Sequence, residues 1–365
     1  GDITNVFGGN DASGTPNGTV KVYLNGGNIT NTYGGGNQTS VPVTNVYLQG
    51  ATAGNVFGGS NMSGDVTTSN VIATSGKATS IYGGNNEGGV TTTSNVTIDG
   101  AESSEVYGGG NLAQTGVTNV KINSGTVVNC FGGGKSADIE TETKVDLNGG
   151  TVTSVYGGSN SSGSVPVSTV NFNDGAVTNI YGGNNEGGSV TTTNVNLKGS
   201  SAKNVFGGGN RASSVTSNIV LDGSSVTNIF GGGNAAGLTT SNINLKSGSS
   251  TNVFGGSNEE GDVDQSNIIT SETTNTNGAV NNDLKINVNS EAVAVNPYWQ
   301  DTNYNSVVTL NVDITNNTDK TIDNWTVSLK DTNSTLYSNY SNHDISESDG
   351  VYTFNQVNRY SANTP

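Results

Sequence analysis

The chain has 365 residues, 54 of them Gly, and is only 31% hydrophobic and 12% charged. Globular proteins are about 25% charged, so this composition argues against an ordinary enzyme, while five prolines and sparse charge argue against disorder. The net charge of −16 is spread thinly and leaves no basic stripe for nucleic acid. Such a chain can fold if a short unit repeats and stacks on its own copies to build a shared core.

The remaining composition gives no sign of a metal, a cofactor or a membrane segment. One cysteine, Cys130, and one histidine, His343, cannot form a disulfide or a usual zinc site. Cys130 stands where other repeats carry Val or Ile, so we expect a small buried hydrophobic residue. No apolar run reaches 18 residues, which predicts no membrane insertion. No signal peptide is present, and because the chain begins inside a repeat we interpret it as a trimmed fragment.

Residues 1–270 contain a repeat marked by an aromatic residue followed by Gly-Gly. It recurs eleven times at spacings of 24 to 26 residues: Phe7, Tyr33, Phe57, Tyr82, Tyr107, Phe131, Tyr156, Tyr181, Phe206, Phe230 and Phe254. The segments between are β-branched and alternating, with Gly and Asn at the turns, and none has a helical period. We therefore predict an all-β fold that begins with a parallel β-solenoid of about eleven turns, called rungs below.

Three sets of residues should then form columns along the solenoid. Branched residues two apart share one face of a strand and should point inward: Val96/Ile98, Val120/Ile122, Val145/Leu147, Val195/Leu197, Ile219/Leu221 and Ile243/Leu245. Asn recurs two places before most aromatics and three or four places after them, which predicts ladders of side-chain amides. The aromatics should form a packed column, with Phe57, Tyr82 and Tyr107 stacked on one another, and Gly should supply positive φ angles at corners.

An alternative is that the solenoid is a polysaccharide lyase or glycoside hydrolase. Such enzymes need paired carboxylates and long loops that wall a cleft, but rung length varies here by only two residues. The densest acidic cluster is Asp138, Glu140, Glu142 and Asp146, with Lys135 nearby; it could ligate Ca²⁺, but a solvated turn is favoured. Glu87 and Glu186 lie four rungs apart, roughly 19 Å, too far for a catalytic pair. We therefore predict no catalysis.

After Phe254 the Gly-Gly period stops. Residues 271–282 have the polar composition of a linker, and a second domain is expected over 283–365. Its alternating segments, such as Val308–Ile314, and its polar turns predict an antiparallel β-sandwich.

One segment of this domain carries a recognisable motif. Residues 312–329 contain Ile-Asp-Asn-Trp-Thr-Val at 322–327 and resemble family-two carbohydrate-binding modules, the cellulose- and xylan-binding sandwiches of bacterial glycosidases. The resemblance covers about 80 residues and implies a planar strip of three aromatics that stack on sugar rings. By spacing these fall on Tyr304, Tyr340 and Tyr360, while Trp299 and Trp325 match buried positions. The chain ends at Pro365, where the family continues into a last strand, so the resemblance implies an incomplete module.

These observations together predict a non-catalytic, secreted or cell-surface bacterial protein. The solenoid would be a stalk, and the C-terminal module would bind a β-1,4-linked polysaccharide, namely cellulose, xylan or chitin, without a metal. Nucleic acid and membrane are not expected partners. A further alternative is self-assembly into filaments through end-to-end association of the solenoid, because terminal rungs have unpaired edges.

Overall fold

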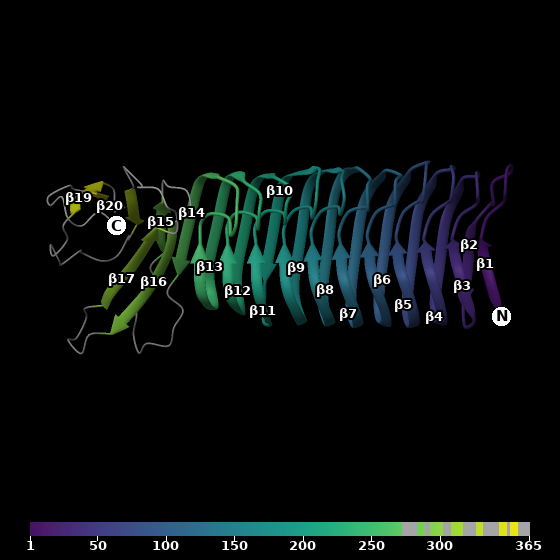
Figure 1. Cartoon of the computed structure of the whole chain (residues 1–365), viewed down its shortest axis with the longest axis horizontal. Helices are drawn as coiled ribbons and strands as arrows, with labels where there is room; N and C mark the ends of the chain where they lie inside the picture. The colour runs from purple at the N-terminus through teal and green to yellow at the C-terminus, as the bar shows by residue number, and fades with distance from the viewer. Residues whose placement is uncertain are drawn as a thin grey trace.

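The structure is a computed structural model that describes residues 1–271 throughout and, beyond them, only the backbone of six strands within 283–356. In this described part every regular element is a β-strand. Residues 1–271 coil into a straight rod of about eleven rungs (Figure 1). The prediction of an all-β protein with a parallel β-solenoid is therefore confirmed.

The rod is formed by fourteen of the described strands. They are β1 (Asp2–Phe7), β2 (Thr19–Leu24), β3 (Asn28–Tyr33), β4 (Val41–Phe57), β5 (Val66–Tyr82), β6 (Thr91–Tyr107), β7 (Thr115–Phe131), β8 (Ile139–Tyr156), β9 (Ser164–Tyr181), β10 (Ser189–Leu197), β11 (Ser201–Phe206), β12 (Ser214–Phe230), β13 (Leu238–Phe254) and β14 (Val263–Ser271). Each aromatic that marks the repeat ends a strand. Most rungs hold one long strand that bends once, whereas β2–β3 and β10–β11 are interrupted at the bend.

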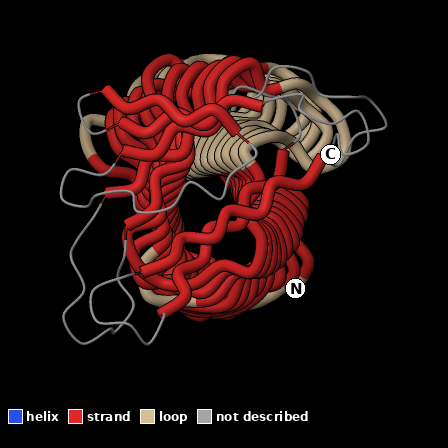
Figure 2. Tube along the Cα trace, turned by 90° about the vertical axis from the view of Figure 1, so that its left-hand side faces the viewer, coloured by secondary structure: helices blue, strands red, loops and turns tan. Residues whose placement is uncertain are grey.

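Each rung has three sides, visible along the rod axis in Figure 2. In the rung of β4, the first face is 41–48, the second face is 52–57 and the turn side is 58–65. Neighbouring rungs pair in parallel and in register, as Val46 with Val71 and Phe57 with Tyr82. The turn side is hydrogen-bonded between rungs as well, for example from the Gly58 N–H to the Tyr82 carbonyl at 2.8 Å. Equivalent residues therefore form columns on all three sides.

The core between the two faces is made of branched side chains. The six pairs predicted to point inward are buried, except that Leu245 near the end of the rod is only partly buried. Cys130 lies in the same core and is fully buried, as predicted. Few apolar residues per rung suffice because each one contacts its copies above and below.

A column of buried hydroxyls spans the interior of eight successive rungs. The Thr44 hydroxyl donates to the Gly58 carbonyl and the Thr118 hydroxyl to the Gly132 carbonyl, both at 2.6 Å. Ser or Thr does the same in eight successive rungs, each time fourteen residues before the glycine. The bond ties the first face to the start of the turn side and satisfies a polar group that would otherwise be buried unpaired.

The glycines have two different roles. Corner glycines such as Gly125, with φ of 98°, have the positive φ that was predicted for them. The glycines that follow the aromatics do not have positive φ; a Cβ on Gly132 would instead overlap the carbonyl oxygen of Gly157 in the next rung. Close backbone approach, rather than turn conformation, therefore explains the Gly-Gly signature.

The C-terminal strands pair antiparallel. They are β15 (Asp283–Val288), β16 (Val293–Asp301), β17 (Val308–Asn316), β18 (Thr326–Lys330), β19 (His343–Ser348) and β20 (Val351–Gln356). β15 pairs with β14, β16 with β17, and β20 with both β18 and β19. The parallel order of the rod thus ends at β14. The linker predicted at 271–282 lies outside the described residues except for Ser271, and the sandwich stays a prediction.

The core predicts a sharp contrast on β7. Replacing the fully buried Ile122 by Ala should lower the free energy of unfolding by about 3 kcal/mol, because lost burial and a residual cavity add together. Val128 lies on the same strand, is 46% exposed and is the control. Val128→Ala should change the free energy of unfolding by less than about 1 kcal/mol. Urea denaturation followed by circular dichroism measures both; equal losses would contradict the assigned core.

Candidate functional site

The eleven aromatics form one continuous stack along the rod. Consecutive ring centroids lie 4.6 to 5.1 Å apart, with interplanar angles of 3 to 12°. Nine rings are buried, whereas Phe7 and Phe254 at the two ends are more exposed. The predicted stacking of Phe57, Tyr82 and Tyr107 is confirmed. The aromatic column is therefore part of the packed interior and not an exposed sugar-binding stripe.

This column is separate from the branched core. It lies where the second face ends and the turn side begins, and some hydroxyls reach the polar columns beside it. The Asn160 side-chain amide donates to the Tyr107 hydroxyl at 2.9 Å, and Ser80 and Ser154 lie near the hydroxyls of Tyr82 and Tyr156. The aromatic stack therefore joins the second face to the turn side.

The choice between Phe and Tyr follows the residue two places earlier. All six Phe rungs carry Asn at that position, whereas three of the five Tyr rungs carry Ser80, Glu105 or Ser154. In those rungs the tyrosine hydroxyl has a polar partner beside it. This pairing can be seen in the sequence when the aromatic is compared with the residue two places earlier. The aromatic position considered alone shows only that Phe and Tyr exchange.

Three long ladders of asparagine amides run along the rod, each Nδ2 donating to the Oδ1 of the preceding rung at 2.8 to 3.1 Å, and a short fourth ladder joins Asn123, Asn148 and Asn173. The two predicted ladders run through Asn5, Asn31 and Asn55, resuming at Asn179, Asn204, Asn228 and Asn252, and through Asn37, Asn61, Asn86 and Asn111, resuming at Asn160, Asn185, Asn210, Asn234 and Asn258. A third ladder, on the first face, was not predicted: Asn45, Asn70, Asn95 and Asn119, resuming at Asn194, Asn218, Asn242 and Asn267. The recurring Ser/Thr-Asn-Val of the sequence signals it.

All three long ladders are interrupted in the rung of β8. Lys135, Lys144 and Ser154 occupy the three positions where ladder asparagines stand elsewhere. Asn160 has no amide below it to accept its proton, and it reaches past Lys135 to the Tyr107 hydroxyl two rungs away. Only the turn-side ladder is broken by this rung alone; the second-face ladder already stops at Ser80, and the first-face ladder also lacks an asparagine at Thr169.

The acidic cluster predicted in this rung is dispersed. Asp138 accepts the Ser164 N–H at 2.8 Å, and Asp146 pairs with Lys144 at 3.2 Å and accepts the Asn171 amide at 2.7 Å. Glu140 and Glu142 are exposed. Among the described residues, no group of three or more His, Cys, Asp and Glu side chains could hold a metal ion.

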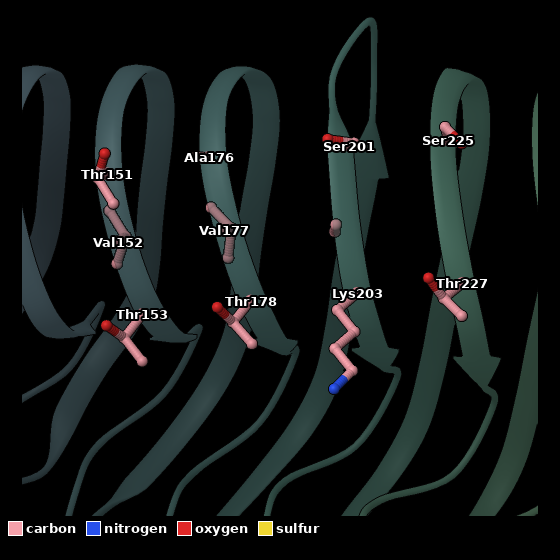
Figure 3. Close-up of a pocket in the computed structure, with 11 residues that line it drawn as sticks. Thr151, Val152, Thr153, Ala176, Val177, Thr178, Ser201, Lys203, Ser225 and Thr227 are labelled. Carbon is pink, nitrogen blue, oxygen red and sulfur yellow. The ribbon is translucent and has the colours of Figure 1, made fainter.

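The second face is hollowed where β8, β9, β11 and β12 lie side by side (Figure 3). This groove has a volume of about 430 Å³ and is lined by Thr151, Val152, Thr153, Ala176, Val177, Thr178, Ser201, Ala202, Lys203, Ser225 and Thr227. Its polar groups are hydroxyls and the Lys203 ammonium, which takes part in none of the three ion pairs of the described residues. Glycoside hydrolysis needs two carboxylates about 5 to 9.5 Å apart, and the groove lining supplies none.

The predicted sugar-binding residues Tyr304, Tyr340 and Tyr360 lie outside the described residues, as does Trp325; Trp299 lies on β16. No known protein family, curated protein or solved structure matches this chain. Within the described part of the chain, no helix is long and apolar enough to cross a membrane.

The interrupted ladder predicts a stabilising substitution. Lys135→Asn should donate to Asn111 and accept from Asn160, which then gives up its bond to the Tyr107 hydroxyl, and the net gain of one hydrogen bond should raise the free energy of unfolding by about 1 kcal/mol. Lys203→Asn removes the same charge where the neighbouring rungs carry Thr178 and Thr227, and should not stabilise. Urea denaturation measures both; no difference between the two variants would contradict the ladder assignment.

The buried tyrosines predict a loss of stability at alkaline pH. Burial raises the pKa of Tyr82 and of Tyr181 to about 12 from an ordinary value of 10.0. Their contribution to stability is complete below pH 10 and decreases as pH rises toward 12, because the folded state keeps protons that the unfolded chain releases. Tyr82→Phe and Tyr181→Phe should each reduce this decrease, measured as unfolding free energy against pH; the exposed Tyr23, changed to Phe, is the control. If the free energy of unfolding of the Tyr82→Phe and Tyr181→Phe variants decreased with pH as steeply as that of the parent chain, the prediction would be wrong.

Proposed function

We propose that this chain is a non-catalytic extracellular protein in which the solenoid is a rigid spacer and the C-terminal module binds a β-1,4-linked polysaccharide such as cellulose or chitin. The observation that carries the spacer proposal is the unbroken stack of eleven aromatic rings. Rings in contact over every rung, with parallel strands on both faces and hydrogen bonds on the turn side, resist bending at any single rung. Ten steps at the strand spacing give a rod roughly 50 Å long.

The surface of the rod also favours a spacer over an enzyme. The groove on the second face is lined by Val and Ala side chains, hydroxyls and one lysine, and it extends over four rungs. The dispersed acids of the β8 rung are exposed or engaged in hydrogen bonds and an ion pair. Both features fit a structural surface better than a site that must hold two carboxylates in a walled cleft.

The sugar-binding part of the proposal rests on the sequence of the C-terminal module. Its Ile-Asp-Asn-Trp-Thr-Val motif and the three tyrosines at positions 304, 340 and 360 resemble family-two carbohydrate-binding modules. A flat β-1,4-linked chain offers a repeated apolar face for stacking on coplanar aromatic rings. Sparse charge, abundant Asn, Ser and Thr, and a single cysteine fit a bacterial protein that is secreted or held at the cell surface.

The test is a pull-down of the full chain on insoluble cellulose and chitin. The triple variant Tyr304→Ala, Tyr340→Ala, Tyr360→Ala should bind about a hundredfold more weakly, since each ring contributes of order 1 kcal/mol beyond simple burial. Tyr23→Ala with Tyr47→Ala is the matched control, because these two stacked rings lie on the rod, and it should bind like the parent chain.

Retention that is equal in the triple variant and the parent would remove the carbohydrate assignment. Binding lost equally in the rod control would move the sugar site onto the solenoid. Release of reducing ends or unsaturated sugars from a polysaccharide panel would instead show an enzyme. Concentration-dependent filaments, seen by light scattering and electron microscopy, would favour the self-assembling alternative.

A further inference from the structure

The third residue after the aromatic is Asn10 and Gly36 in the first two rungs and then follows a regular order. From Phe57 onward it is Ser60, Asn85, Gly110, Gly134, Ser159, Asn184, Gly209, Gly233 and Ser257. The order Ser, Asn, Gly, Gly therefore occurs twice and starts a third time. The corresponding aromatics Phe57, Tyr156 and Phe254 are 99 and 98 residues apart, so a unit of four rungs is superimposed on the single-rung repeat.

The structure gives the first half of this order a physical basis. Asn85 and Asn184 are fully buried at the start of the turn side. The Oδ1 of each accepts a backbone N–H from the serine of the preceding rung, Ser60 at 2.8 Å and Ser159 at 2.7 Å. Each Nδ2 donates to two glycine carbonyls, one in its own turn and one in the turn before. An identical bonded amide therefore fills the turn in two rungs that lie four apart.

The serines and glycines of this order also have specific contacts with neighbouring rungs. The hydroxyls of Ser60, Ser159 and Ser257 each donate to the carbonyl of the residue 21 or 22 positions earlier, at 2.9 to 3.3 Å. In the rung after each buried asparagine, a Cβ on Gly110 or Gly209 would overlap the carbonyl oxygen of that asparagine. A side chain cannot occupy this position without displacing the backbone, so the turn that follows the asparagine turn carries Gly.

We propose that the four-rung block, and not the single rung, is the structural unit of this solenoid, with one unit at 57–155, a second at 156–253 and the start of a third at 254. Removal of one whole unit of four rungs, about 19 Å at the strand spacing, then keeps the native contact between every pair of successive turns. The inference goes beyond the proposed spacer function and does not depend on the identity of the polysaccharide.

The turn-side amide ladder changes at the same place. Lys135, the residue that interrupts this ladder, lies in the last rung of the first unit, directly before the second unit begins at Tyr156. The ladder is then continuous from Asn160 to Asn258. The other two long ladders are also interrupted in this rung, at Lys144 and Ser154, but the second-face ladder already stops at Ser80 within the first unit, and the first-face ladder resumes only after Thr169.

The test compares two deletions in the full chain. Deletion of 82–180 removes four rungs and places the Asn184 turn on the Ser60 turn, so that the native Ser-to-Asn contact is kept. Deletion of 107–155 removes only two rungs but places the Ser159 turn on Asn85, where the structure has Gly110. We expect the four-rung deletion to unfold cooperatively near the parent melting temperature with the rod shortened by about 19 Å in solution scattering.

The variant with the two-rung deletion keeps more rungs than the variant with the four-rung deletion. It should nevertheless melt about 5 °C or more below that variant. This order is the reverse of what chain length alone predicts for stacked repeats. Gly110→Ser tests the same contact without deletion and should lower the melting temperature, whereas Gly26→Ser, at a position with open space around the added atom, should not. A four-rung deletion that fails to fold, or a two-rung deletion that is equally or more stable, would overturn the proposal.

Discussion

The constraint on which the structure depends is that every residue of a rung lies directly above its equivalent, about one strand spacing away. A side chain is therefore selected less for its neighbours in sequence than for its compatibility with copies of itself. Aromatic rings, amides and branched aliphatics satisfy this condition, because they stack, form donor-acceptor ladders or interdigitate. Like charges do not, and where charges do occur in neighbouring rungs they alternate in sign, as in Lys77–Glu102 at 2.6 Å and Glu186–Arg211 at 3.0 Å.

The unusual composition follows from this rule. Asn is abundant because each amide in a column both donates and accepts, so a ladder position is satisfied without water. Charged residues are scarce because a charge ends a ladder, as Lys135 and Lys144 do, and leaves the amides on either side to find other partners. Large apolar residues are few because one branched pair per rung, repeated, builds a continuous core. A content of 12% charged residues is a consequence of the architecture and not a mark of disorder.

The columns determine how much could be predicted from the sequence. Strands, rung length, inward-facing pairs, two of the amide ladders and the aromatic stack follow from spacing alone, because each is a property of one repeated position. The positive φ of the corner glycines follows in the same way, but the sequence alone does not show that Gly132 is required by the approach of the next rung. The link between Tyr82 and Ser80, and the order Ser, Asn, Gly, Gly, depend on two positions or on several rungs at once. Averaging the repeats into one consensus erases such relations.

The same constraint decides where function can reside. A catalytic pair needs two different groups at a defined separation with perturbed surroundings, and a strict column offers the same kind of group at every step. Chemistry must therefore arise where the repetition stops. In the described rod these places are the charged rung of β8, where no three acids converge, and the groove near the β10–β11 interruption, where Lys203 stands among hydroxyls. Neither gathers opposed carboxylates, and this favours the proposed division of roles, in which the rod is a spacer and the non-repetitive C-terminal sequence carries recognition.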